Sequence, residues 1–320
     1  METRPGSQPG LTVARLQRLA RLLQGAVRSD LAIDFLNATS ALPWVQPRKL
    51  YQDPETKALY PSSAIATLPA ERRWKLVSRT FEERDFYEGR YGQPIAYAAF
   101  VDALAELGVA SLSGKSVIDI GYASILQLRL MACLGARVVG LETDRFPHAL
   151  YGFEGDCGPV RPVRGRTIDR SHEGSVQLVR GRFGTDWSPP PATVDLLLSR
   201  NTLKQGYVHP HKDHSHEPNV RLGLSDKAFL DAARQALAKG GIFAIYNTFD
   251  PRDTGPGADG TSPFAAEQFA QSGFELMHFN HPDDARFRSL VDILRTAGTE
   301  LAGTVAAEAP RALFTAARAV

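Results

Sequence analysis

The feature that most limits the fold is the rhythm of the chain after Gly114, where short apolar runs alternate with segments of helical length. Seven runs have the length and composition of strands: KSVIDIG, ARVVGLE, SVQLVRG, TVDLLLS, GGIFAIYN, GFELMHF and RALFTAARAV. Strands that are apolar on both faces and alternate with helices are typical of a mostly parallel sheet covered on each side. The pattern therefore predicts a Rossmann-like α/β domain over residues 111–320, with a seven-stranded sheet. One helix between the strands is expected to begin after Ser225 and to end at Gly240 and Gly241.

The first third of the chain has a different pattern. Its apolar residues recur mostly at intervals of three and four, and prolines separate the segments. We expect residues 11–110 to form a helical N-terminal cap or lid without strands, with Trp44 and Trp74 in its core. Residues 1–10 are polar and rich in Gly and Pro, which predicts a disordered tail. The arginine-rich residues 1–28 also fit a transit peptide, although an amphipathic helix packed on the main domain explains them equally well.

Composition and charge narrow the functional class. The 320 residues carry a formal net charge of +2, which gives no chain-wide field that would attract nucleic acid or an anionic membrane. No apolar run approaches the roughly 18 residues that a membrane span needs. Two cysteines do not make the framework of a small secreted protein. We expect a cytoplasmic monomer or homodimer that acts on a small molecule, with no nucleic-acid or membrane partner.

One predicted strand ends in an acid and a glycine and runs straight into a helix, in SVIDIGYASILQLRL. In an open α/β sheet, ligands bind outside the carboxyl ends of the strands, where a glycine lets the backbone approach and the next helix offers free amides. Asp119, Gly121, Tyr122 and Ala123 fall at that place. Glu142 ends the following strand, 21 residues after Gly121, and its carboxylate can accept hydrogen bonds from both hydroxyls of a ribose. Together these residues predict a nucleoside site.

The glycine pattern distinguishes between nucleoside cofactors. A dinucleotide fingerprint requires glycines at positions 121, 123 and 126, so that a pyrophosphate can lie on the helix. This chain has Gly121, Ala123 and Leu126 there. The pattern disfavours a nicotinamide-dependent oxidoreductase.

At these residues the chain resembles the class I S-adenosylmethionine-dependent methyltransferases, in which the first strand ends in an acid, one residue and a glycine, and the second strand ends in an acid. The resemblance covers roughly residues 114–320. More narrowly, GYASILQLRLMACLGA and SRNTLKQGYVHP resemble a little-characterised bacterial branch of that superfamily. A second glycine is expected in that branch where this chain has Ala123.

The resemblance implies a cofactor, S-adenosylmethionine, and roles for particular residues. Asp119 and Gly121 would frame the methionine and ribose end, and Glu142 would hold the ribose diol. The family often has an acid after the third strand, whereas VRGRFG places Arg182 and Phe183 there, and Phe183 can stack on the adenine. The residues expected to bind the cofactor are Asp119, Gly121, Tyr122, Ala123, Glu142, Phe183, Ser199, Arg90 and Tyr91.

Arg90 and Tyr91 lie in FYEGRYGQPIAY, just before the sheet begins. A guanidinium can hold the carboxylate of the methionine moiety in a bidentate manner, and an aromatic face attracts a sulfonium. Packing of Tyr91 between the cap and the sheet is the alternative.

A second group of polar residues follows the fourth predicted strand, in SRNTLKQGYVHPHKDHSHE. In the superfamily this segment faces the methionine part of the cofactor and the acceptor, which implies catalytic roles for Asn201, Tyr207 and His209. An oxygen or nitrogen acceptor must lose a proton during methyl transfer, and histidine suits that task near neutral pH. His209 is therefore the expected base, and Tyr207 would orient the acceptor or the methyl group. A solvated loop histidine is the alternative.

The same loop is rich in possible metal ligands, but its pattern does not favour a metal. The spacing fits no helical pair of ligands and the stretch is hydrophilic throughout. We expect an exposed loop without a metal site at His209, His211, Asp213, His214, His216 and Glu217.

These observations predict an S-adenosylmethionine-dependent methyltransferase, a transferase that modifies a small-molecule metabolite in biosynthesis. Two alternatives keep the fold. A cyclase or lyase would consume the cofactor and release methylthioadenosine. A non-catalytic binding module on a degenerate methyltransferase fold would account for Ala123 and Arg182.

Overall fold

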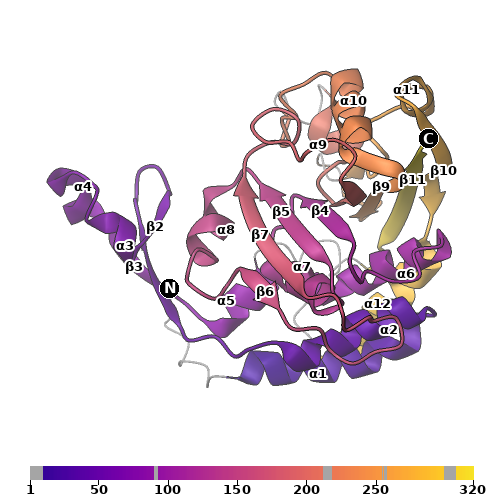
Figure 1. The fold of residues 1–320 in the computed structure, drawn as a ribbon. Helices are drawn as coiled ribbons and strands as arrows, with labels where there is room; N and C mark the ends of the chain where they lie inside the picture. The colour runs from indigo at the N-terminus through magenta and orange to yellow at the C-terminus, as the bar shows by residue number, and fades with distance from the viewer. Residues whose placement is uncertain (1–9, 90–92, 212–217, 254, 256–257, 299–307) are drawn as a thin grey trace.

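The computed structural model describes residues 10–89, 93–211, 218–253, 255, 258–298 and 308–320. An eight-stranded sheet forms its centre, helices lie on both faces, and a small three-stranded sheet belongs to the N-terminal part (Figure 1). Nearly all of the predicted disordered tail, residues 1–9, lies outside the described residues. No helix within the described ranges has the length and apolar content to cross a membrane.

The central sheet confirms the predicted mostly parallel α/β fold and corrects its strand count. Its order is β10-β11-β9-β8-β4-β5-β7-β6. The pairings β4–β5, β5–β7, β4–β8 and β8–β9 are parallel, whereas β11 is antiparallel to both of its neighbours. All seven predicted strands are present, but the predicted number of strands in the sheet was wrong. The short segment GPV adds an eighth, β6, as an antiparallel edge strand beside β7. The strands are β4 (Ser116–Ile120), β5 (Arg137–Glu142), β6 (Gly158–Val160), β7 (Gly174–Arg180), β8 (Val194–Arg200), β9 (Leu237–Phe249), β10 (Phe274–Pro282) and β11 (Arg311–Ala319).

The strand order reverses at the boundary between β4 and β8. From β4 the chain moves to β5 and then β7 on one side, and it returns to β8 and β9 on the other side. In open α/β sheets such a reversal opens a crevice at the carboxyl ends of the strands, where ligands bind. The fold thus places the segments after β4 and β8 side by side at one edge.

Alternate residues of the strands explain why helices cover both faces. Val117 and Leu196 belong to one hydrophobic cluster, while Ile118 and Leu197 belong to another on the opposite face. This side-to-side alternation is the ordinary geometry of a strand. The helices after Gly114 are α7 (Ile125–Cys133), α8 (Arg145–Leu150), α9 (Gln205–Val208), α10 (Asp226–Ala236), α11 (Ala266–Gln271) and α12 (Asp284–Thr296).

Helix α10 begins as predicted and ends earlier than predicted. Ser225 caps it by accepting a hydrogen bond from the Ala228 backbone N–H (3.3 Å). The helix ends at Ala236, and the expected end at Gly240 and Gly241 was wrong. Leu237 is fully buried and starts β9, so tertiary packing takes the last residues of the predicted helix into the sheet.

The N-terminal part contains strands that the sequence prediction did not include. β1 (Arg48–Gln52) pairs in antiparallel fashion with β2 (Leu59–Pro61) and with β3 (Val77–Phe81). The cap is therefore not purely helical. Its helices are α1 (Leu11–Leu23), α2 (Asp30–Asn37), α3 (Ser62–Ile65), α4 (Ala70–Lys75), α5 (Glu83–Glu88) and α6 (Ala98–Glu106), with short 3-10 segments η1 (Gln24–Ala26), η2 (Ala38–Ala41) and η3 (Pro94–Tyr97).

The two tryptophans predicted in the cap core are exposed. Trp44 is 55% and Trp74 is 88% accessible. Trp74 lies on the six-residue α4, which projects with α3 and the tip of the small sheet away from the rest of the molecule (Figure 1). The real cap core is continuous with the main domain, since Phe100 of α6 stacks on Tyr246 of β9 with ring centroids 5.2 Å apart.

Candidate functional site

A cavity of about 1720 Å³ lies where the strand order reverses. Its walls come from the segments that follow β4, β5, β7, β8 and β9, and from Glu88, Gly89, Pro94 and Tyr97 of the cap. A pocket for one small ligand usually measures about 300–1,000 Å³, so this cavity has room for two. Of the residues predicted from the sequence, those that line it are Asp119, Gly121, Tyr122, Ala123, Glu142, Phe183, Asn201 and Tyr207.

The turn after β4 is held in a conformation that favours small residues. Gly121 has φ +72° and Ala123 has φ +51°, both in the left-handed region. The Gly121 N–H donates to the Leu141 carbonyl (2.8 Å), which ties the turn to β5. Ser124 then caps α7 by accepting from the Leu126 N–H (3.2 Å). Ala123 thus occupies a left-handed position that a glycine would adopt without strain. The turn adopts this conformation although the expected second glycine is an alanine.

Asp119 is buried at the cavity floor, where two side chains hold it. The Tyr97 hydroxyl donates to Oδ1 (3.2 Å), and the Gln127 amide donates to Oδ2 (3.3 Å). Burial raises the pKa of Asp119 to about 7, against the opposing effect of these hydrogen bonds and of Arg200. The carboxyl group therefore serves mainly to order the floor below the turn.

Glu142 ends β5 with one carboxylate oxygen engaged and the other available. Oε1 accepts from the backbone N–H groups of Thr143 (2.7 Å) and Asp144 (3.1 Å). Within the described residues, no hydrogen bond to Oε2 is present. Burial raises the pKa of Glu142, while the two backbone donors oppose that rise. A carboxylate fixed in this way can accept two hydroxyl hydrogen bonds at the rim of the cavity.

The segment after β7 supplies an aromatic wall. Phe183 is buried and packs against Phe229, with ring centroids 5.6 Å apart. Arg182 turns instead to Asp186, with Nε–Oδ2 at 2.8 Å and Nη2–Oδ1 at 3.1 Å. Asp186 also lines the cavity. This wall therefore contains an acid, four residues after Arg182, which occupies the position where the family often has one.

Two predicted residues, one near the end of β8 and one directly after it, have structural roles. Ser199 does not line the cavity; it is buried, and its Oγ accepts from the Leu203 N–H (3.1 Å). Asn201 adopts φ +61° and its amide binds Thr248 on β9, donating to Oγ1 (3.0 Å) and accepting from the backbone N–H (2.6 Å). Tyr207 lines the cavity beside Lys204. Asn201 therefore positions this loop and has little capacity left for a ligand.

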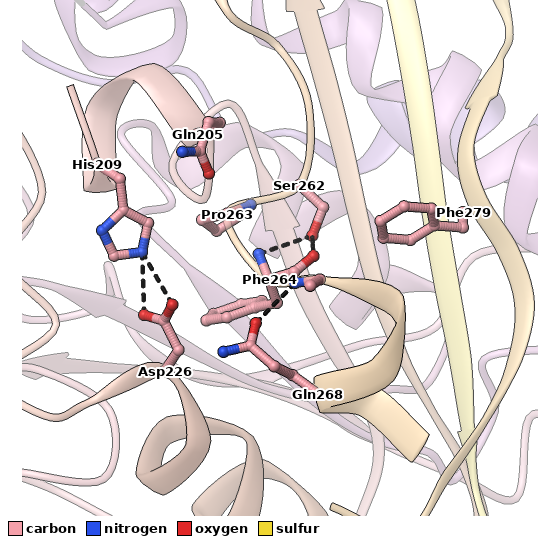
Figure 2. Close-up of a pocket in the computed structure, with 9 residues that line it drawn as sticks. Gln205, His209, Asp226, Ser262, Pro263, Phe264, Gln268 and Phe279 are labelled. Atoms are coloured by element: carbon pink, nitrogen blue, oxygen red, sulfur yellow. Dashed lines mark hydrogen bonds and ion pairs between the residues drawn. The ribbon is translucent and has the colours of Figure 1, made fainter. Parts of the chain in front are cut away.

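His209 lies in a different pocket from the other predicted residues. It faces a separate shallow pocket with Gln205, Asp226 and Ser262, as Figure 2 shows. Its Nε2 is 3.0 Å from both carboxylate oxygens of Asp226, and its side chain is 42% exposed. The cavity lining does not include it. The structure thus separates His209 from Tyr207, two residues before it, because the α9 turn directs them to opposite sides.

Other predictions fall on residues that the structure does not describe. Arg90 and Tyr91 lie outside the described residues, as do Asp213, His214, His216 and Glu217 of the histidine-rich loop. Among the residues described, no group of three or more His, Cys, Asp or Glu side chains is arranged to hold a metal ion.

Two cationic residues of the cavity were missed by the sequence analysis. Arg200 ends β8, with its guanidinium carbon 5.9 Å from the centre of the Tyr97 ring. Its Nε is buried and has no hydrogen-bond partner in the part of the chain that is described. Lys204 is only 1% exposed. The signal was present in LLLSRNTLK, where two cations lie at and just after the end of a strand with an apolar centre.

Comparison with known proteins gives a fold likeness only. No family model and no curated protein matches the chain. A solved S-adenosylmethionine-dependent methyltransferase from Mesorhizobium loti is similar at 16% identity and a TM-score of 0.36, covering 69% of this chain and 97% of that one. The (4+2)-cyclase SpnF is similar at 15% identity and a TM-score of 0.38, covering 73% and 85%.

A third similar structure contains the product of a methyl donor. It is a phosphoethanolamine N-methyltransferase 2 of Haemonchus contortus, solved with phosphomonomethylethanolamine and S-adenosylhomocysteine. The identity is 12% and the TM-score 0.39, covering 86% of this chain and 68% of that one. Because these likenesses are weak in sequence, the function proposed below depends on the side chains of this chain.

Proposed function

We propose that this chain binds S-adenosylmethionine in the large cavity and transfers its methyl group to a small-molecule metabolite. The observation that carries the proposal is Glu142 at the end of β5, with Oε2 available beside the left-handed turn at Gly121. A fixed carboxylate next to a tight glycine turn suits the two hydroxyls of a ribose.

The remaining walls fit the other parts of the cofactor. Phe183 offers a ring face to an adenine, on the β7 side of Glu142. On the opposite side, the half-buried Arg200 lines the cavity, and its buried Nε has no hydrogen-bond partner among the described residues. A guanidinium suits the carboxylate of the methionine moiety. The cofactor, when bound, supplies an activated methyl group on a sulfonium.

The chain's own contribution would be alignment and exclusion of water. Glu88, Gly89, Pro94 and Tyr97 of the cap form part of the cavity wall. The Asn201–Thr248 bonds would fix the loop that faces the acceptor. In-line displacement depends on such alignment more than on covalent help from the protein. A volume of about 1720 Å³ also leaves room for an acceptor of metabolite size beside the cofactor.

His209 has no part in this proposal, because it lines the separate pocket. A biosynthetic role and a cytoplasmic location remain predictions from the sequence.

The test has two stages. Calorimetry with S-adenosylhomocysteine first measures binding, which we expect in the micromolar range. The protein is then incubated with S-adenosylmethionine carrying a deuterated methyl group and a filtered small-molecule extract. Release of S-adenosylhomocysteine with a deuterated-methyl product is expected. Methylthioadenosine would indicate a cyclase or lyase, and binding without turnover a non-catalytic module. Absence of binding would contradict the whole proposal.

A further inference from the structure

Lys204 is an ammonium group buried against the cavity wall. Its side chain is 1% exposed, and Nζ donates to the Thr248 carbonyl at 2.5 Å. Nζ also lies 5.1 Å from the centre of the Tyr207 ring. No carboxylate of the described residues forms an ion pair with it. Burial of a cation without an anionic partner costs several kcal/mol, and a neutral amine would avoid that cost.

The position of Lys204 follows from the strand order. Glu142 ends β5, and Thr248, which holds Lys204, lies near the end of β9. β4 and β8 lie between them. Neighbouring strands are about 4.8 Å apart, so these two ends are separated by roughly 14 Å. A nucleoside held by Glu142 and extended across β4 would bring its sulfonium to β8 and the acceptor to the side of Lys204.

We propose that Lys204 is the catalytic base of the methyl transfer, a neutral amine that faces the sulfonium and takes the proton of the acceptor. The inference rests on the function proposed above. The acceptor oxygen or nitrogen forms a bond to the methyl carbon, the carbon–sulfur bond breaks, and its electron pair stays on sulfur. The proton of the acceptor moves to Nζ, which later returns it to water.

The groups around Lys204 shift its protonation equilibrium toward the neutral amine. Burial first, and then the charge of Arg200, lowers the pKa of Lys204 to about 8, while Asp253 opposes this change. Asp250 and Arg252, from the same loop after β9, also line the cavity. A neutral amine still donates one N–H to the Thr248 carbonyl, which points its lone pair elsewhere. Catalytic lysines are commonly brought into this range by burial and neighbouring charge.

The test compares proton release when the charged and the neutral cofactor bind. S-adenosylmethionine carries a sulfonium, and S-adenosylhomocysteine does not. Calorimetry at pH 8 in buffers of different ionisation enthalpy measures the protons released by each. A positive sulfonium beside Lys204 lowers its pKa further. A fall of about one unit releases roughly 0.4 proton per site. We expect this excess for S-adenosylmethionine in the wild-type protein.

Variants isolate the contribution of Lys204. The ligand's own amine contributes equally in every variant, so the excess should fall by about 0.4 proton per site in Lys204→Met. It should fall by the same amount in Lys204→Arg, whose guanidinium keeps its proton. Lys227→Met removes an exposed lysine and should leave the excess unchanged. An excess as large in both Lys204 variants as in the wild-type protein would overturn the inference.

Turnover with the small-molecule extract provides the second readout. Lys204→Met should retain cofactor affinity and lose about 10²- to 10⁴-fold in turnover. Turnover that survives would show that Lys204 is near the sulfonium without acting as the base, and the inference would be wrong. Failure of the wild-type protein to bind either cofactor form would instead overturn the proposed function.

Discussion

Thr202, on the loop after β8, occupies the space that a side chain at Gly121 would need. A Cβ at Gly121 would overlap Thr202 Oγ1, whose hydroxyl donates to the Gly121 carbonyl (3.3 Å). Gly121→Ala adds left-handed backbone strain to this overlap, so we expect the free energy of unfolding to fall by about 2–4 kcal/mol. S-adenosylhomocysteine should bind more weakly, because the turn at the cavity must shift. Denaturant titration and calorimetry measure the two effects.

Gly240→Ala is the matched control for that substitution. Gly240 has φ +78°, close to the +72° of Gly121, but a Cβ there meets no atom within 4 Å. This variant should lose only the backbone strain, about 1–2 kcal/mol, and should bind the cofactor normally. Equal losses of stability and of affinity in the two variants would show that the contact with Thr202 is unimportant.

The contribution of Glu142 to the affinity for a ribose-containing ligand can be measured without turnover. Glu142→Ala removes an acceptor whose Oε1 is already fixed by the backbone. We expect affinity for S-adenosylhomocysteine to fall by about 1–3 kcal/mol, or roughly 5- to 150-fold. The exposed Glu154 provides a control, and Glu154→Ala should leave the affinity unchanged. Unchanged affinity in Glu142→Ala would remove the basis for the nucleoside site.

Arg200 should distinguish ligands that carry the methionine carboxylate from those that lack it. S-adenosylhomocysteine has this carboxylate, whereas methylthioadenosine does not. Arg200→Met should therefore weaken binding of S-adenosylhomocysteine by about 1.5–3 kcal/mol and leave methylthioadenosine unaffected. Arg180, at the end of β7, also lines the cavity, and Arg180→Met should not change the ratio of the two affinities. Equal weakening of both ligands by Arg200→Met would contradict the assignment.

The features predicted correctly are those that local sequence determines. Apolar runs, and the residues at which they end, predict seven of the strands. They also predict the turn at Gly121 and the position of Glu142 at a strand end. Parallel strands bring their carboxyl ends to one edge, so the position of a residue at a strand end already places it near the site. The prediction that Ser199 lines the site was wrong. Ser199 lies one residue before the end of β8, and the alternation of side chains along the strand directs it into the core.

The features missed depend on contacts between distant segments. β3 is short, and it forms only because its residues pair with residues of β1 that lie 25 or more positions earlier. Lys204 is buried against Thr248 of β9, and the half-buried Arg200 lies against Tyr97 of the cap. No local pattern reveals either contact. The direction of His209 depends on the turn of α9 and on Asp226, seventeen positions away in sequence. Tertiary packing, rather than residue type, decides which side chains reach the cavity.

The buried carboxyl group of Asp119 should make stability depend on pH. Its pKa is raised to about 7 by burial, whereas an unfolded aspartate ionises near 3.9. Between these values the folded protein holds a proton that the unfolded chain has lost. The free energy of unfolding therefore falls as pH rises, by up to about 1.4 kcal/mol per pH unit from this group.

Asp119→Asn tests this dependence because an amide does not titrate. The melting temperature of the variant relative to the wild-type protein should rise from about pH 4 to about pH 7 and level off on both sides. Tyr97→Phe removes the hydroxyl that donates to Oδ1 and favours the ionised carboxylate, so it should extend the window to higher pH. Thermal melts at half-unit intervals of pH give both curves. A difference in melting temperature between Asp119→Asn and the wild-type protein that stays constant across that range would contradict this prediction. It would mean that the carboxyl group ionises equally in the folded and the unfolded chain, and that burial does not raise its pKa.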